Sequence, residues 1–298
     1  MNKLVVIGLG LIGGSVSKGV GERGLARERI GVVRDAETAR IAVELGVVDR
    51  ACLSVDEICG ELAADDLVFI AVPTLAVESI LAKLKAPIAA GVAVTDGASV
   101  KGSVAEAAAR VFGSVPPNLV LGHPIAGSEK SGVTAANADL YVDHRVILTP
   151  ADTTDTLALA RVTQLWQKLG AEVINMPIDE HDQVLGATSH LPHAIAYSLV
   201  DTLAHDIDNP NIFRYAAGGF RDFTRIASSD PVMWHDIMRA NRDSVVASLE
   251  LFMGNLQRLK TAVESDDGEY LLAMFSRAKQ ARDLYTQLGE PKLPKSKD

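Results

Sequence analysis

The chain has 298 residues, 48% of them hydrophobic and 22% charged, as in ordinary globular proteins. Its formal net charge of −9 disfavours a general nucleic-acid binder, which needs a basic surface to neutralise phosphates. No apolar run reaches the roughly 18 residues of a membrane span, and two cysteines are too few for a disulfide framework. We therefore expect a cytoplasmic protein that binds neither membrane nor nucleic acid.

A glycine-rich turn follows the first predicted strand, residues 3–8. The segment VVIGLGLIGG places Gly8, Gly10 and Gly13 in the spacing GxGxxG, and Leu11 and Ile12 open the helix that comes next. In this motif the first glycine allows the tight turn, the second lets a pyrophosphate approach the backbone, and the third lets helix and strand pack closely. The sequence therefore predicts a dinucleotide cofactor at the N-terminus of the first helix.

The end of the second predicted strand, residues 29–34, bears on which dinucleotide binds. NAD-binding proteins usually carry a carboxylate there, which accepts a hydrogen bond from the ribose 2′-hydroxyl. Here the position is Val33, and it is followed by Arg34, whose guanidinium can pair with the 2′-phosphate of NADP. We expect NADP, with NAD as the alternative, since Asp35 would serve NAD if the register differs by two residues.

Short apolar runs alternate with helical patterns up to residue 176. After the first two strands, further strands are expected at residues 66–72, 91–96, 118–122, 144–149 and 171–176. Several of the segments between them carry apolar residues at spacings of three and four, as amphipathic helices do. This alternation predicts a Rossmann-like, doubly wound α/β domain with a mostly parallel sheet.

Polar side chains follow two of these strands, at the edge where a cofactor would lie. Ser99 and Lys101 come shortly after the strand that ends at Asp96, and His123 directly follows the strand that ends at Gly122. Imidazole has the pKa and reach of a base that removes a hydroxyl proton as hydride leaves the carbon. We therefore predict that His123 is catalytic. Whether Ser99 orients the imidazole or only begins the next helix stays open.

Long helical patterns replace strands after Pro177. Residues 231–263 form the longest, with Asp230 and Pro231 placed as N-cap and first helical residue. Its apolar positions spread wider than one stripe, so we expect it to be buried on more than one face. The sequence thus predicts a nucleotide-binding domain over residues 1–177 and an all-helical domain over residues 178–298 that also packs against a partner subunit.

Two polar groups mark the helical half. TSHLPH places His190 and His193 on one helix face, but no third ligand is apparent, and we expect no metal. Further along, Arg221 and Arg225 suit an anionic substrate, since each guanidinium can bind a carboxylate through two hydrogen bonds. A salt-bridge cluster at the surface or at a dimer interface explains the two arginines equally well.

Five segments, in order along the chain, resemble the prephenate and arogenate (cyclohexadienyl) dehydrogenases of tyrosine biosynthesis. They are GLGLIGGS, TDGASVKG, GHPIAGSEKSG, ATSHLPH and GGFRDFTRIASSDPVMW, and the resemblance runs from about residue 3 to residue 285. It implies a homodimer with a Rossmann-like N-terminal domain and a helical C-terminal dimerisation domain. It departs at Val33, where many members have Asp, so their preference for NAD is not carried over.

The resemblance also implies roles for single residues. His123 looks like the base that takes the 4-hydroxyl proton, Ser99 like its hydrogen-bonding partner, and Arg225 like the group that holds the ring carboxylate. His193 looks like a contact of the substrate or the nicotinamide, and His190 is a further candidate.

The implied reaction is an oxidative decarboxylation. Hydride leaves C4 of the cyclohexadiene for the nicotinamide, His123 accepts the hydroxyl proton, and loss of CO₂ from C1 makes the ring aromatic. The product is 4-hydroxyphenylpyruvate from prephenate or tyrosine from arogenate. Glu129, six residues after His123, would attract the ammonium group that only arogenate carries.

Two alternatives remain open. One is another dehydrogenase with a Rossmann half and a helical half, of the 3-hydroxyacid or 6-phosphogluconate type, in which a lysine would act and His123 would have no role. The other is a sensing module that binds NADP without turnover.

Overall fold

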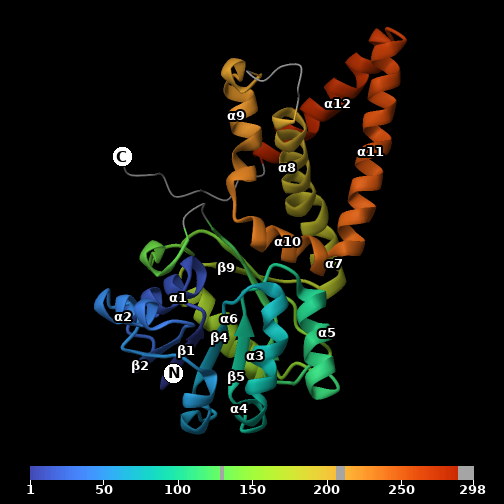
Figure 1. Cartoon of the computed structure of the whole chain (residues 1–298). Coiled ribbons are helices and arrows are strands. Elements are labelled where there is room, and N and C mark those ends of the chain that lie inside the picture. Colours follow the sequence, from blue (N-terminus) through green and yellow to red (C-terminus); the bar gives the residue numbers. More distant parts are fainter. Residues whose placement is uncertain (128–130, 206–211, 288–298) are drawn as a thin grey trace.

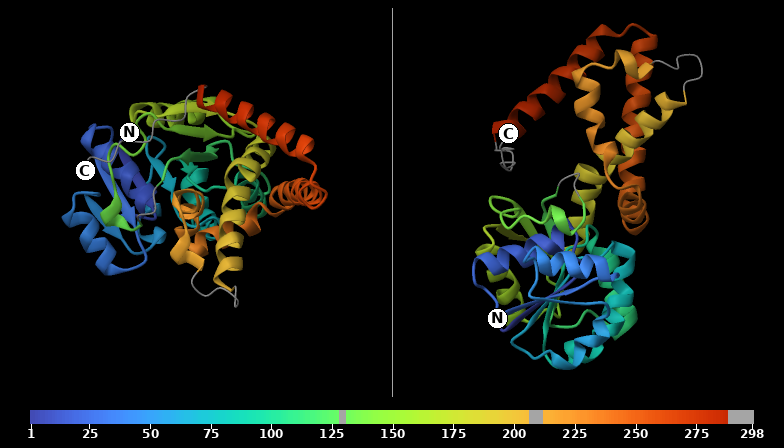
Figure 2. Two further views of the ribbon diagram at one scale, coloured as in Figure 1. Left: turned by 90° about the horizontal axis from the view of Figure 1, so that it is seen from above. Right: turned by 60° about the vertical axis from the view of Figure 1, so that its left-hand side comes forward.

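A computed structural model describes residues 1–127, 131–205 and 212–287 of the chain. An α/β domain and a helical domain are stacked on one another (Figure 1). The helical domain rises as a separate lobe, in which the next-to-last helix points away from the sheet and the last helix turns back from its far end (Figure 2). Within the described residues, no helix is both long and apolar enough to cross a bilayer.

The main sheet has six parallel strands in the order β3-β2-β1-β4-β5-β6, which confirms the doubly wound α/β prediction. The strands are β1 (Lys3–Ile7), β2 (Glu28–Val32), β3 (Arg50–Cys52), β4 (Leu67–Ile70), β5 (Ala93–Asp96) and β6 (Leu119–Val120). Because side chains alternate along a strand, β1 sends Leu4 and Val6 to one face and Val5 and Ile7 to the other. Both faces are covered, and the central strands are therefore apolar throughout.

Helices cover the two faces of the sheet in separate groups. The first face packs against α1 (Leu11–Glu22), α2 (Ala36–Glu44) and α6 (Thr156–Lys168). The second packs against α3 (Val77–Lys83), α4 (Lys85–Ala89) and α5 (Lys101–Phe112). This layering fixes α1 and α5 with their N-termini at the carboxyl edge of the sheet, where the predicted site lies (Figure 1).

A second, three-stranded sheet follows, and it corrects one prediction. It comprises β7 (Gly122–Ile125), β8 (Arg145–Leu148) and β9 (Glu172–Asn175), with β7 antiparallel to β8 and β8 parallel to β9. The segment 118–122 is therefore not one strand: β6 ends at Val120 and the chain turns into β7. His123 thus lies inside a strand rather than beyond the end of one. This strand was not predicted because Pro124 interrupts it, and only an edge strand tolerates a proline.

The helical domain begins directly after the last strand. It contains α7 (Ile178–Leu185), a π-helical turn (Gly186–His190), α8 (Leu191–Ala204), α9 (Gly218–Thr224), α10 (Pro231–Ala240), α11 (Arg242–Glu264) and α12 (Gly268–Gln287). Within the described part of the chain, no strand follows residue 177. Asp230 caps α10 as predicted, accepting hydrogen bonds from the N–H groups of Val232 and Met233 at 2.8 and 3.0 Å.

The predicted single helix over residues 231–263 is wrong, because the chain breaks at Asn241 into α10 and α11. Asn241 leaves the helical conformation, with φ −107° and ψ 34°, and its buried amide donates to the backbone carbonyl of Asp182 at 2.8 Å. A buried side chain that bonds the backbone of another helix offsets the lost helical geometry. The break lets α10 lie on the α/β domain while α11 points away from it (Figure 1).

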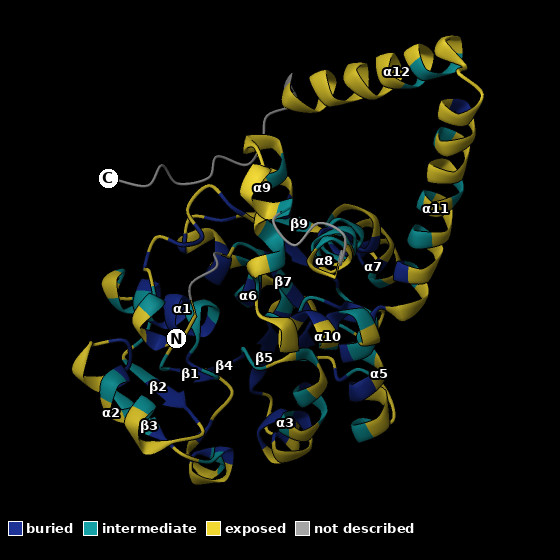
Figure 3. Cartoon of the chain, turned by 45° about the horizontal axis from the view of Figure 1, so that its top comes forward, coloured by how far each residue is buried: buried dark blue, intermediate teal, exposed yellow. Residues whose placement is uncertain are grey.

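The two last helices are mostly exposed, as Figure 3 shows. Between them α11 and α12 bury only Val245 and Ala262. Apolar residues instead lie on their surface, among them Leu251, Leu272 and Phe275, which are 69%, 68% and 56% exposed.

Candidate active site

The glycine loop after β1 has the shape that a dinucleotide needs. Gly8 has a φ of +96°, and a Cβ added there would lie 2.3 Å from the carbonyl oxygen of Ala71. A Cβ on Gly13 would lie 2.0 Å from the carbonyl oxygen of Gly8. At Gly10, in contrast, an added Cβ would meet nothing within 4 Å, so this glycine faces open space. The loop is closed on its protein side and open where a pyrophosphate would approach.

The first turn of α1 is free to receive an anion. No side chain caps the helix at Gly10, and the turn that begins with Leu11 and Ile12 contains no acidic residue. Unpaired N–H groups and the helix dipole favour negative charge at such an end. The residues present therefore fit a dinucleotide, whose nicotinamide would supply the acceptor for a hydride.

Two charged residues follow β2, Arg34 and Asp35, and of these only Asp35 makes side-chain hydrogen bonds within the described residues. Val33 is buried in the core, whereas Arg34 is exposed and its guanidinium makes no hydrogen bond within the described ranges. Asp35 caps α2, because its carboxylate accepts from the N–H and the hydroxyl of Thr38, both at 2.8 Å. The alternative in which Asp35 binds a ribose would require it to give up this cap.

The strand ends bring this loop and His123 to one edge of the sheet. The loop at Gly8 lies against Ala71, which follows β4, and Ile12 of α1 lies close to Gly97, which follows β5. The carboxylate of Asp96 at the end of β5 then accepts from the N–H of Gly122 at 3.1 Å. The base candidate next to Gly122 therefore lies at the same edge as the cofactor loop.

His123 is poised as a neutral base. Its Nδ1 lies 2.9 Å from Nε2 of His181, and part of its surface stays accessible. Burial lowers the pKa of His123 well below 6.5, and the neighbouring His181, Lys101 and His190 lower it further. At neutral pH the imidazole therefore carries no charge and can accept a proton.

Two residues that lie next to one another behind His123, His181 and Asp182, were not predicted from the sequence. Nδ1 of His181 lies 2.7 Å from Oδ1 of Asp182, and both residues are buried. The carboxylate of Asp182 also accepts from the N–H groups of Lys101 at 2.9 Å and Gly102 at 2.7 Å, at the N-terminus of α5. The available signal was an imidazole and a carboxylate side by side in the helix that follows the last strand.

The contacts of Ser99 and Lys101 differ from the hydrogen bond between Ser99 and His123 that the resemblance implies. Within the described part of the chain the Ser99 hydroxyl makes no hydrogen bond, and the ring of His123 meets His181 instead. Lys101 is fully buried, forms an ion pair with Asp96 and donates to the carbonyl of Gly122 at 2.5 Å. Lys101 thereby ties the end of β5 to the start of β7.

Two histidines of the helical domain meet around one tryptophan. The ring of His193 stacks on Trp234 with centroids 3.6 Å apart, and buried His190 meets the same ring edge-on at 6.0 Å. Burial lowers the pKa of His190 to about 4. Burial also lowers the pKa of His193, and the positive charge of nearby Arg225 contributes. The structure thus brings His190 and His193 together on Trp234, and Arg225 lies near enough to His193 to influence its pKa.

Two predicted site residues remain, Arg221 and Glu129. Arg221 lies exposed on α9, and its side chain makes no contact with a charged partner within residues 1–127, 131–205 and 212–287. Glu129 lies outside the described residues.

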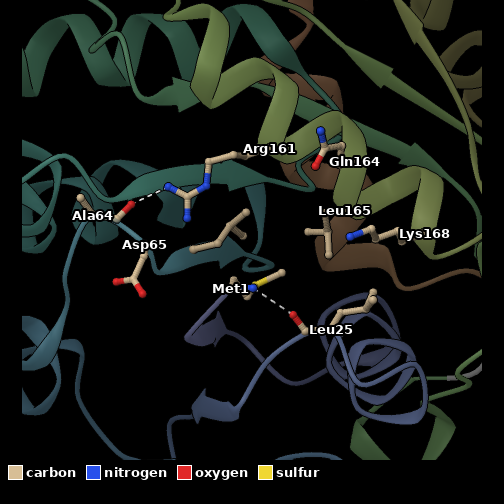
Figure 4. A pocket seen from close by; sticks show the side chains of 9 residues that line it. Met1, Leu25, Ala64, Asp65, Arg161, Gln164, Leu165 and Lys168 are labelled. Carbon is tan, nitrogen blue, oxygen red and sulfur yellow. Dashed lines mark hydrogen bonds between the residues drawn. The ribbon is translucent and has the colours of Figure 1, made fainter.

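A hollow of about 540 Å³ lies elsewhere, and Figure 4 shows its lining. Met1, which precedes β1, and Leu67, which begins β4, both line it, so it opens at the amino edge of the sheet. The cofactor loop and His123 lie at the carboxyl edge. The hollow is therefore separate from the candidate site.

We predict contrasting effects of substitutions at the first two glycines of the loop. Gly10→Ala should fold with a melting temperature close to that of the parent, because its Cβ enters open space, yet weaken dinucleotide binding roughly tenfold or more by obstructing the pyrophosphate. Gly8→Ala should lower the melting temperature, because φ is +96° and the Ala71 carbonyl is in the way. Calorimetric titration with each dinucleotide and thermal melts measure both. Unchanged binding by Gly10→Ala would contradict the assignment of the loop.

Comparison with known proteins finds family matches for both domains. Residues 16–175 match the family model of the prephenate dehydrogenase nucleotide-binding domain, and residues 177–277 match that of the prephenate dehydrogenase dimerization domain. The chain is 35% identical to a cyclohexadienyl dehydrogenase of Zymomonas mobilis, over 94% of each protein. It is 38% identical to a prephenate dehydrogenase of Bacillus subtilis, over 94% of this chain and 75% of the relative.

A solved structure agrees with these sequence matches. The prephenate dehydrogenase of Aquifex aeolicus, in complex with hydroxyphenyl propionate and NAD+, superimposes with a TM-score of 0.89 at 36% identity, covering 96% of this chain and 98% of that one. Both domains, their order and their fold are shared with these proteins, and the chain belongs to the prephenate dehydrogenase family.

Proposed function

We propose that this chain oxidatively decarboxylates prephenate, arogenate or both, with transfer of a hydride to NAD(P). The observation that carries the proposal is the neutral imidazole of His123, placed at the edge of the sheet that also holds the glycine loop. The relatives support it, since they are named cyclohexadienyl and prephenate dehydrogenases.

The residues divide the chemistry between the two domains. The free ring nitrogen of His123, Nε2, accepts the proton of the 4-hydroxyl group while the hydride leaves the same carbon. Arg225 has no carboxylate partner within the described residues, so its guanidinium is free to bind the ring carboxylate until CO₂ departs. His193, which is electrostatically coupled to Arg225, borders the same substrate.

The buried lysine argues against the alternative dehydrogenase chemistry. In that alternative a lysine would act on the substrate, and Lys101 begins α5 at the edge that holds the glycine loop. Its ammonium group is fully buried and paired with Asp96, so it faces no substrate. The alternative of a sensing module predicts no turnover and is decided by the assay that follows.

Initial rates of nicotinamide reduction, measured with prephenate or arogenate and with NAD or NADP, test the proposal. We expect turnover in at least one of the four combinations, and the better substrate shows whether an ammonium group is accepted. His123→Gln should lower kcat about 10²- to 10⁴-fold, the typical contribution of a general base. The matched control is His205→Gln, an exposed histidine on the surface of α8's C-terminus.

Two results would overturn the proposal. Folded protein that turns over neither substrate with either dinucleotide would reject the activity, and a His123→Gln variant with parental kcat would reject the base.

We infer that NADP is preferred over NAD. Support comes from Arg34, which is exposed with a free guanidinium, from apolar Val33 at the carboxylate position, and from Asp35, which is engaged as a helix cap. A 2′-phosphate could pair with the guanidinium of Arg34 and would meet no carboxylate at position 33. The carboxylate of Asp35 is held in place by its hydrogen bonds to Thr38.

Replacing Arg34 by alanine tests this inference. The KM for NADP should rise about tenfold or more, because a charge-assisted pair is lost, while the KM for NAD should stay within twofold. Lys18→Ala on α1 serves as a control for the loss of a positive charge near the same domain surface. A wild-type preference for NAD, or equal effects of Arg34→Ala on both dinucleotides, would refute the preference.

We also propose that two copies assemble through α11 and α12. Exposed apolar side chains gather along these helices, and exposed contiguous apolar surface marks an interface. They include Leu251, Met253, Leu256, Leu272 and Phe275. α11 points away from the α/β domain and α12 turns back from its far end, so that a second copy can reach this part of the lobe (Figure 2).

Phe275→Asp should shift the protein from dimer to monomer at micromolar concentration, because it places a charge inside the proposed apolar interface. Sedimentation velocity measures the change. Leu157→Asp is the matched control, since Leu157 is a 74% exposed leucine on α6 of the α/β domain. A dimer that survives Phe275→Asp but not Leu157→Asp would place the interface on the other domain.

A further inference from the structure

We propose that Asp182 acts through His181 to fix the tautomer of His123, so that the proton-accepting nitrogen Nε2 always carries a lone pair. His181 and Asp182 are then positioning residues for the base. The inference rests on the proposed function for its kinetic part only, because a tautomer is a property of the resting enzyme.

The argument starts at Asp182, which is an acceptor and not a donor. Burial alone would raise its pKa, but hydrogen bonds from His181 and from the backbone N–H groups of Lys101 and Gly102 hold the pKa below its usual value. Its Oδ1 accepts from Lys101 and its Oδ2 accepts from Gly102, at the N-terminus of the twelve-residue helix α5. The carboxylate is therefore ionised and fixed in direction.

The protons of the two rings follow from this fixed acceptor. Since Asp182 only accepts, Nδ1 of His181, 2.7 Å away, must donate, and a neutral His181 then has its lone pair on Nε2. That lone pair lies 2.9 Å from Nδ1 of His123, so Nδ1 of His123 must carry the proton. The lone pair of neutral His123 is consequently on Nε2. The opposite tautomer would direct two lone pairs at each other.

The same chain stabilises the charge that forms during the reaction. The proton leaves the substrate oxygen and binds Nε2 of His123, which makes an imidazolium. Its Nδ1 proton can pass to Nε2 of His181, and the positive charge then rests beside the Asp182 carboxylate. The other charged group nearby, Lys101, is already neutralised by Asp96. No proton is gained or lost in these transfers.

Nitrogen NMR of the wild-type enzyme tests the tautomer without any variant. Protein labelled with ¹⁵N at its seven histidines, in the presence of saturating dinucleotide, gives ring-nitrogen patterns that distinguish the two neutral tautomers. We expect His123 and His181 both to carry the proton on Nδ1. His123→Gln and His181→Gln spectra assign the two signals. A proton on Nε2 of His123 in the wild type would overturn the proposal, whatever the enzyme's activity.

Kinetics of His181→Gln test the consequence for turnover. Glutamine can either accept from or donate to His123, so it does not fix the tautomer, and we expect kcat to fall roughly 10²-fold with both KM values within threefold. The His123 signal of this variant should show both tautomers. His144→Gln, which removes a buried histidine bonded only to the Val142 carbonyl, should keep parental kcat.

The outcomes separate this proposal from the proposed function. A His181→Gln variant whose kcat stays within threefold of the parent, including one whose KM rises while kcat is unchanged, rejects the positioning role. The proposed activity would still stand. A wild type that turns over neither substrate rejects the activity, and the nitrogen spectrum still decides the tautomer.

Discussion

The contact on which the active site depends is the buried ion pair between Lys101 and Asp96. It bridges the two sheets: Asp96 ends β5, and the Lys101 ammonium reaches the carbonyl of Gly122 at the start of β7. Asp96 also accepts from the N–H of Gly122, so both backbone groups of that residue are held. Loss of either partner would leave an uncompensated charge in the interior, which typically costs about 3–5 kcal/mol. The position of His123 follows from this arrangement.

The carboxylate of Asp182 is one of the contacts that attach the helical domain near the same point. Asp182 lies in α7, near the domain boundary, and its carboxylate bonds the N-terminus of α5. The side-chain nitrogen of Asn241 donates to the Asp182 carbonyl and lies 3.0 Å from Nδ1 of His190. The π-helical turn Gly186–His190 between these contacts brings His190 inward, a use of local irregularity that is frequent at functional sites. Groups from both domains that we propose for catalysis and substrate binding are thereby held by one polar network.

The parts of this structure that local pattern determines were predictable. The central apolar strands β1, β4 and β5, the GxGxxG turn and the Asp230 cap depend on neighbours in sequence, and they were placed correctly. The break at Asn241 and the strand containing His123 depend on partners far along the chain, such as Asp182 and Leu148, which no local pattern reveals. For the same reason the spacing left the role of Ser99 open and did not identify His181, 58 residues from His123, as the residue that its ring meets.

The exposure of α12 has a consequence for folding. A helix of 20 residues that buries no side chain in its own chain gains little from tertiary packing, which is the main source of helix stability in proteins. If a second copy buries the exposed side chains of α12, part of the free energy of folding is gained only when the two copies associate. The melting temperature then depends on protein concentration, and dilution would unravel the C-terminal helix before it affects the nucleotide-binding sheet.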